Sequence, residues 1–127
     1  MLADNKAFSG FAVPDLDQAE DFYGKTLGLK VTRDAPMLIT LHLAGDRPTM
    51  VYLKPDFEPA TYTILNFPVD DIDKAVAELS ERGVSFERYE GFEQDEKGIA
   101  RGDQGGPPIA WFKDPAGNIL AVLEDGR

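Results

Sequence analysis

The chain has 127 residues, of which 43% are hydrophobic and 10% aromatic, which suits one globular domain and is too apolar for a disordered chain. Asp and Glu total 23 against 13 for Lys and Arg, and the formal net charge of −10 argues against binding to nucleic acid or to an anionic membrane surface. The absence of cysteine excludes disulfides, thiolate nucleophiles and zinc–thiolate sites. Because the sequence shows no secretory signal and no membrane-spanning apolar run, we expect a cytoplasmic protein.

Two segments of the chain repeat one pattern, which indicates a duplicated module. The matched positions, 56 residues apart, are Phe11 and Phe67, Val13 and Val69, Asp15 and Asp71, Leu16 and Ile72, Asp17 and Asp73, and Ala19 and Ala75. With a one-residue gap, Gly28 then matches Gly83. The repeat covers about half of the chain, so it predicts two modules and not a solenoid.

The first copy predicts a strand, a helix and three further strands. Residues 8–13 alternate in character, as a half-buried strand does, and Asp15 or Asp17 is placed to cap the helix that follows. Gly28 ends that helix, and residues 29–33, 37–43 and 50–53 are predicted strands.

The second copy predicts the same order of elements. Asp71 or Asp73 caps its helix, Gly83 ends it, and residues 84–89, 109–112 and 119–123 are predicted strands. Residues 91–108 are rich in Gly, Asp and Gln and are predicted to form a long polar loop, a length typical of lids and binding loops. Whether this loop closes as a lid is left open.

Four motifs carry a resemblance to a known family. They are Val-Pro-Asp-Leu at 13–16, Phe-Tyr at 22–23, Leu-Gly-Leu at 27–29 and Phe-Lys-Asp-Pro-Ala-Gly-Asn at 112–118. The chain thereby resembles the vicinal-oxygen-chelate superfamily, which includes glyoxalase I, extradiol dioxygenases, fosfomycin-resistance enzymes and bleomycin-resistance proteins. The resemblance implies an α+β fold in one domain, residues 1–127. Its two βαβββ modules, about 6–56 and 60–125, would curl mixed sheets into an incomplete barrel around a cavity. It also implies a homodimer, although the sequence does not distinguish a self-contained barrel from a dimer with exchanged modules.

Metal-dependent members of that superfamily hold a divalent ion with His, Gln or Glu near the first strand of each module and in the last strand. The matching positions here are Phe8, Tyr52, Ile64 and Ala121. None of these side chains supplies a carboxylate or imidazole ligand, so we expect no metal and no cofactor. Glyoxalase and dioxygenase chemistry is disfavoured for the same reason.

Strand alternation selects the side chains that face the expected cavity. Aromatic rings dominate this set, together with a few polar groups, as is typical of a site that stacks against small molecules. The predicted ligand-binding residues are Phe8, His42, Tyr52, Asn66, Glu87, Tyr89 and Trp111. Each of them also has a purely structural interpretation; Phe8 and Ile64, for example, would then pack into the space that the metal leaves.

Three functions remain open at this point. The first is binding of a small aromatic or cationic molecule without turnover, as in the bleomycin-resistance branch, with no catalytic residue. The second is a lyase or isomerase in which His42 transfers protons together with Tyr52 or Glu87. The third is a non-catalytic interaction subunit whose cavity is filled by its own side chains.

Overall fold

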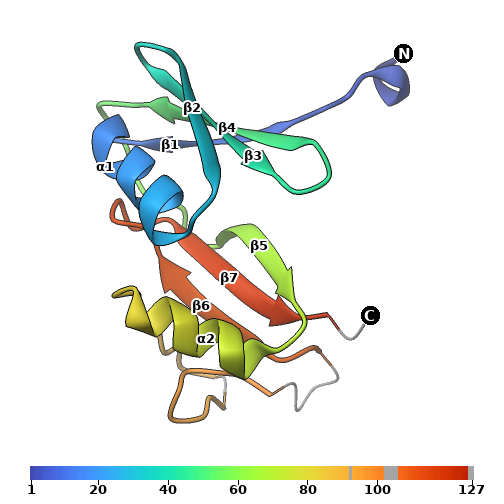
Figure 1. Cartoon of the computed structure of the whole chain (residues 1–127), viewed down its shortest axis with the longest axis vertical. Coiled ribbons are helices and arrows are strands. Elements are labelled where there is room, and N and C mark those ends of the chain that lie inside the picture. Colours follow the sequence, from blue (N-terminus) through green and yellow to red (C-terminus); the bar gives the residue numbers. More distant parts are fainter. Residues whose placement is uncertain (92, 102–105, 126–127) are drawn as a thin grey trace. The chain divides into compact units, whose positions relative to one another are not determined.

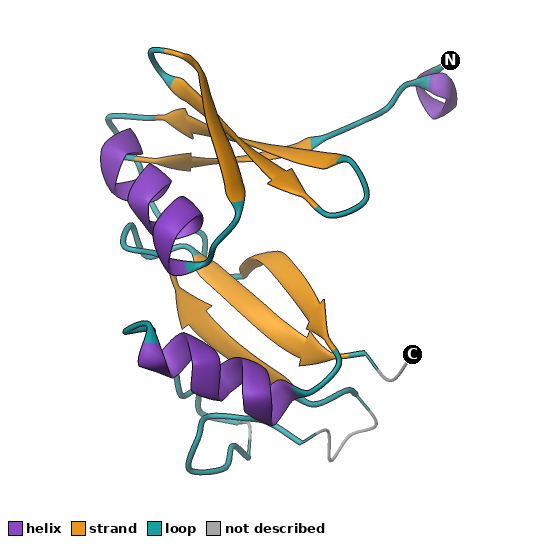
Figure 2. Ribbon diagram, in the orientation of Figure 1, coloured by secondary structure: helices purple, strands orange, loops and turns teal. Residues whose placement is uncertain are grey.

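The computed structural model describes residues 1–91, 93–101 and 106–125. These residues form two compact units, Met1–Glu58 and Pro59–Arg127, each of which contains one copy of the sequence repeat. Both units are α+β, and each has a mixed sheet that does not close on itself, with its helix on one side (Figures 1 and 2). The predicted fold class, two βαβββ-like modules, is therefore correct.

The first unit has a four-stranded sheet. After a short 3-10 turn, η1 (Leu2–Asp4), the elements are β1 (Ser9–Val13), α1 (Leu16–Asp21), a π-helical turn η2 (Phe22–Thr26), β2 (Lys30–Ala35), β3 (Leu38–Leu43) and β4 (Arg47–Leu53). The strand order is β1-β4-β3-β2, with β1 parallel to β4 and the other pairs antiparallel. Tyr23 of η2 is fully buried, and its ring centroid lies 5.7 Å from that of Phe11 in β1. This contact places the helical segment on the face of the sheet that carries Phe11.

The second unit has three ladder strands. Its elements are β5 (Thr63–Val69), α2 (Ile72–Glu81), β6 (Ile109–Lys113) and β7 (Ile119–Glu124). The strand order is β5-β7-β6, with β5 parallel to β7 and β6 antiparallel to it. Buried Ile72 and Val76 of α2, together with Phe112, Leu120 and Val122 of the sheet, belong to the core of this unit.

The repeated aspartates have the same two roles in both units. Asp15 accepts a hydrogen bond from the backbone N–H of Gln18 at 3.0 Å, and Asp71 accepts one from Lys74 at 3.1 Å. Each is thus the N-cap of its helix, whereas the second aspartate of each pair, two residues later, forms ion pairs instead. The matched glycines also agree, because Gly28 and Gly83 both have positive φ angles of 75° and 91° just after the helical segment.

The predicted strand at 84–89 is wrong. This segment makes one isolated bridge, from Phe86 to Phe112, and one further hydrogen bond from the Glu87 N–H to the Trp111 carbonyl at 2.8 Å. On its other side the Gln94 amide takes the place of a strand. Its Nε2 donates to the carbonyls of Glu87 (2.9 Å) and Gly98 (2.7 Å), and its Oε1 accepts from the Tyr89 N–H at 2.8 Å. A side chain therefore satisfies the backbone groups that a ladder would otherwise pair.

Part of the predicted 91–108 loop is folded. Asp95 accepts hydrogen bonds from the N–H groups of Lys97 and Ile99, both at 2.9 Å, and Ile99 is fully buried. Arg101 and Lys97 then tie this turn to Asp73 of α2 through ion pairs of 2.8 and 3.1 Å. Residues 92 and 102–105 of the predicted loop lie outside the described residues.

The N-caps are the first target for a stability test. Replacing Asp71 by Ala leaves the first-turn N–H of Lys74 without its acceptor, and we expect a loss of about 1 kcal/mol in the free energy of unfolding, measured by urea denaturation. Asp15→Ala should cost a similar amount. Asp70→Ala, one residue before the second cap, is the control and should change stability by no more than a few tenths of a kcal/mol. Equal effects of the Asp70 and Asp71 substitutions would contradict the assignment.

The Asp73 cluster predicts a pH dependence. Hydrogen bonds from Arg101 and then Lys97 lower the pKa of Asp73 from 3.8 to about 2. Because the folded-state pKa is depressed, the stabilisation is complete above about pH 4 and disappears as the pH falls towards about 2. The stability difference between the wild type and Asp73→Asn should therefore shrink to zero over this range in acid-unfolding measurements. When both proteins also carry Arg101→Gln, the stability difference that Asp73→Asn makes should depend less on pH. The same pH dependence in that background would contradict the role of Arg101.

Candidate functional site

The first sheet has a face opposite α1, here called its helix-free face. Strand register places its residues in three rows across the sheet. These rows are Lys30–His42–Pro48, Thr32–Thr40–Met50–Gly10 and Leu38–Tyr52–Ala12. His42 and Tyr52, two of the predicted ligand-binding residues, thus share this face.

His42 lies in a hydrogen-bonded cluster that the sequence analysis missed. Its Nε2 lies 2.8 Å from the Thr32 hydroxyl, and the hydroxyls of Thr32 (3.4 Å) and Thr40 both donate to the Asp34 carboxylate. An ionised carboxylate only accepts, so in its 3.4 Å contact with Asp34 the Thr32 hydroxyl is the donor, and its oxygen can then accept from the Nε2–H of His42. In that tautomer, Nδ1 of the exposed imidazole is a proton acceptor.

Tyr52 and Phe8 do not join this cluster. Tyr52 lies four residues along β4 from Pro48, the register partner of His42, which corresponds to about 13 Å. Its side chain is 45% exposed, and Phe8, which immediately precedes β1, is 60% exposed.

The second sheet has a helix-free face of its own, which brings four predicted residues together. The register aligns Asn66, Ala121 and Trp111 in one row, and the Glu87 N–H bonded to the Trp111 carbonyl extends this row by one position. The ring of Tyr89 meets Trp111 edge-on, with centroids 5.5 Å apart and an interplanar angle of 77°.

The polar groups of this row differ in how they are satisfied. The Glu87 carboxylate lies 3.5 Å from the Lys113 ammonium, so a neighbouring cation offsets its charge. The Tyr89 hydroxyl oxygen is buried and has no hydrogen-bond partner among the described residues. Burial, and to a lesser extent the charge of Glu87, raises the pKa of this phenol, which therefore stays protonated and available as a donor at neutral pH.

The positions expected to hold a metal do not fit one. Phe8 and Tyr52 are exposed, Ala121 is fully buried, and Ile64 offers only a hydrocarbon side chain. Benzyl, methyl and butyl groups supply no electron pair for a divalent ion, and a neutral phenol is a poor ligand. Within residues 1–91, 93–101 and 106–125, no three His, Asp or Glu side chains gather into a possible metal site.

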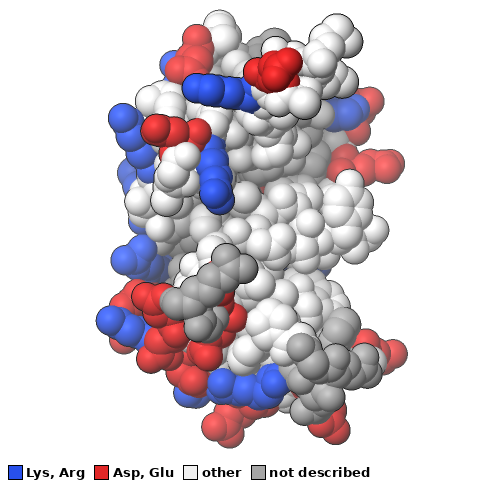
Figure 3. All heavy atoms as spheres, turned by 90° about the vertical axis from the view of Figure 1, so that its right-hand side faces the viewer, with Lys and Arg blue, Asp and Glu red and all other residues white. Residues whose placement is uncertain are grey.

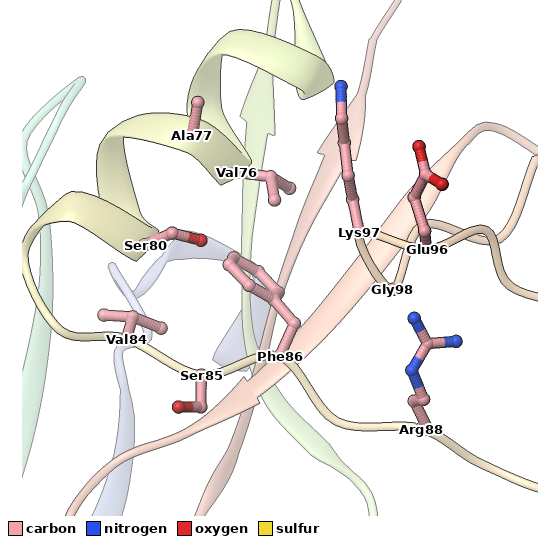
Figure 4. A pocket seen from close by; sticks show the side chains of 10 residues that line it. All are labelled: Val76, Ala77, Ser80, Val84, Ser85, Phe86, Arg88, Glu96, Lys97 and Gly98. Carbon is pink, nitrogen blue, oxygen red and sulfur yellow. The ribbon is translucent and has the colours of Figure 1, made fainter.

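A pocket among the described residues lies away from both of these faces. It has a volume of about 430 Å³ and lies in the second unit, between α2, the 84–88 segment and the turn at 96–98 (Figure 4). None of the predicted ligand-binding residues lines it.

Charge and hydropathy place further limits on the chain. On the face drawn in Figure 3, Lys and Arg side chains lie among Asp and Glu and do not gather into one basic surface. In the described part of the chain, no helix combines the length and apolar character needed to cross a bilayer.

Comparison with known proteins identifies the family. A family model described as the glyoxalase/bleomycin resistance protein/dioxygenase superfamily matches residues 7–122. The chain belongs to this superfamily. No curated protein sequence matches it closely.

Solved structures of the superfamily share the fold. An antibiotic binding protein from Streptomyces sp. CB03234, TnmS3, is 25% identical with a TM-score of 0.66, and the match covers 95% of this chain and 97% of that chain. A superfamily member from Alicyclobacillus acidocaldarius is also 25% identical, with a TM-score of 0.68 and coverage of 95% and 91%. The fosfomycin resistance protein FosX from Listeria monocytogenes, at 13% identity, TM-score 0.72 and coverage of 96% and 93%, is similar in fold alone.

Proposed function

We propose that this superfamily member binds a small aromatic molecule without chemical turnover and without a metal, in the manner of a drug-sequestering protein. The observation that carries the proposal is on the second sheet, where the ring centroids of Trp111 and Tyr89 lie 5.5 Å apart. Asn66 lies in the same row as Trp111, across Ala121. The rings of Trp111 and Tyr89 offer stacking to a planar ligand, and the Asn66 amide and the Tyr89 hydroxyl offer hydrogen bonds. The antibiotic binding function of the Streptomyces protein supports this class of function.

The proposed ligand carries a hydrogen-bond acceptor. The Tyr89 hydroxyl is buried and has no partner among the described residues, and a ligand oxygen or nitrogen that reached it would satisfy it. The cationic alternative has weaker support, since Lys113 already lies beside the Glu87 carboxylate. A cytoplasmic location, a homodimer, and ligand-binding roles for Phe8, His42 and Tyr52 remain part of the proposal.

Trp111 is the single tryptophan of the chain and reports directly on this site. We expect neutral 9-anthracenemethanol to quench its fluorescence more strongly than the planar cation proflavine. Trp111→Leu should weaken binding several-fold to about tenfold in calorimetry, because a stacking partner is lost. Tyr62→Leu, which removes an aromatic ring that is 69% exposed, is the matched control and should bind as the wild type does. Absence of quenching by a broad panel of planar compounds would refute the proposal.

A second candidate is proton transfer by His42, which the Thr32–Asp34 contact favours. In this alternative Asp34 and Thr32 are positioning residues that hold the imidazole with its proton on Nε2, so that Nδ1 accepts a proton from a substrate. Tyr52, about 13 Å away along the sheet, is a poor partner for it.

The tautomer of His42 tests this alternative. Nitrogen NMR of the wild type should show the proton on Nε2, and both Thr32→Val and Asp34→Asn should increase the population of the other tautomer. Thr26→Val, at the end of η2, is the control. A tautomer that does not respond to either substitution, or a His42→Ala variant that retains any activity found, would exclude proton transfer by this residue.

A further inference from the structure

The pocket beside α2 is built from three neighbouring segments of the second unit. It is lined by Val76, Ala77 and Ser80 of α2, by Val84, Ser85, Phe86 and Arg88, and by Glu96, Lys97 and Gly98 (Figure 4). It lies on the side of the sheet that carries α2, away from the row of Trp111. Its volume of about 430 Å³ falls in the range of small-molecule sites.

The floor of this pocket is apolar and fixed. The ring of Phe86 packs edge-on against buried Phe112, with centroids 5.7 Å apart, and Val76 and Val84 are buried beside it. Gly98 has a φ of +89°, and a Cβ at this position would lie 3.1 Å from the Cβ of Phe86. A glycine is therefore what allows the turn to approach the ring and form the opposite wall.

Arg88 presents a positioned cation at the pocket. Its Nη2 donates to the Asp95 carbonyl at 2.7 Å, which anchors the guanidinium, and among the described residues no carboxylate lies within ion-pair distance of it. Lys97, in contrast, is paired with Asp73 at 3.1 Å. A guanidinium has five N–H donors, so most of those of Arg88 stay available for a planar anion.

The surrounding charge selects the kind of anion. Glu96 lines the same pocket, and the whole chain carries a net charge of −10. Both repel anions, and they repel a dianion such as a phosphate monoester more than a monoanion. The pocket therefore favours a monoanion that makes one charge-assisted contact with Arg88 and buries an apolar body against Phe86.

We propose that this pocket is a second binding site, for a small monocarboxylate with an apolar or aromatic body. The carboxylate binds to the guanidinium of Arg88, and the body lies on Phe86, Val76 and Val84. The hydroxyls of Ser80 and Ser85 line the same pocket and offer uncharged hydrogen-bonding groups to the ligand. This site stands independently of the proposed function at Trp111.

The test uses 3-phenylpropionate as the probe and backbone amide NMR of the full chain as the readout. Saturable shifts should appear at residues 76–80, 84–88 and 96–98 and be absent from Asn66 and Trp111. The uncharged analogue 3-phenylpropanamide should bind about tenfold more weakly or worse, because it loses the charged contact. Shifts confined to the Trp111 face, or equal binding of acid and amide, would overturn the proposal.

Two variants separate the charge from the cavity. Arg88→Gln should weaken binding of 3-phenylpropionate at least about tenfold, whereas Lys74→Gln, the same charge change on the exposed side of α2, should not. Ser80→Trp fills the cavity, keeps every charge and should also abolish binding, so the test holds even if Arg88→Gln disturbs the turn at 96–98. Retained binding in Ser80→Trp, or an equal loss in Lys74→Gln, would rule the site out.

Discussion

Each unit depends on a pair of aspartates, two residues apart, at the start of its helix. The first of the pair caps the helix, and the second forms an ion pair with a segment beyond it: Asp17 with Arg33 of β2, and Asp73 with Arg101. The cap fixes where the helix begins, and the exposed ion pair adds a contact between the helix and a later segment. The same two-residue spacing thus has the same pair of roles in both copies.

Most of the fold could be predicted from the sequence because its signals are local. The alternation of apolar residues, the capping aspartates and the stop glycines Gly28 and Gly83 all act within a few residues of one another. The segment at 84–89 was mispredicted because its fate depends on Gln94, a residue outside the pattern. The Gln94 amide bonds the backbone of Glu87 and Tyr89 at ordinary hydrogen-bond distances, as a neighbouring strand would. The hydrophobic periodicity of residues 84–89 does not indicate that a distant side chain will do this.

The candidate site divides in the same way. Register follows from alternation, so the shared face of Asn66, Trp111 and Glu87 could be predicted. The Thr32–Asp34 contact with His42 could not be, because it requires knowing which strand lies next to β3. The pocket at Arg88 was also missed, since it arises from a turn approaching a helix and from the close contact that Gly98 permits.

The amide of Gln94 has an evolutionary consequence. A strand is the product of many residues and changes slowly, but a surrogate for a strand that consists of one side chain can be gained or lost by a single mutation. The backbone at 87–89 carries Tyr89 to Trp111 on one side of the sheet and Arg88 to the α2 pocket on the other. A substitution at position 94 would therefore reshape both proposed binding surfaces at once while leaving the ladder of β5, β7 and β6 intact, which offers this scaffold a short route to new ligands.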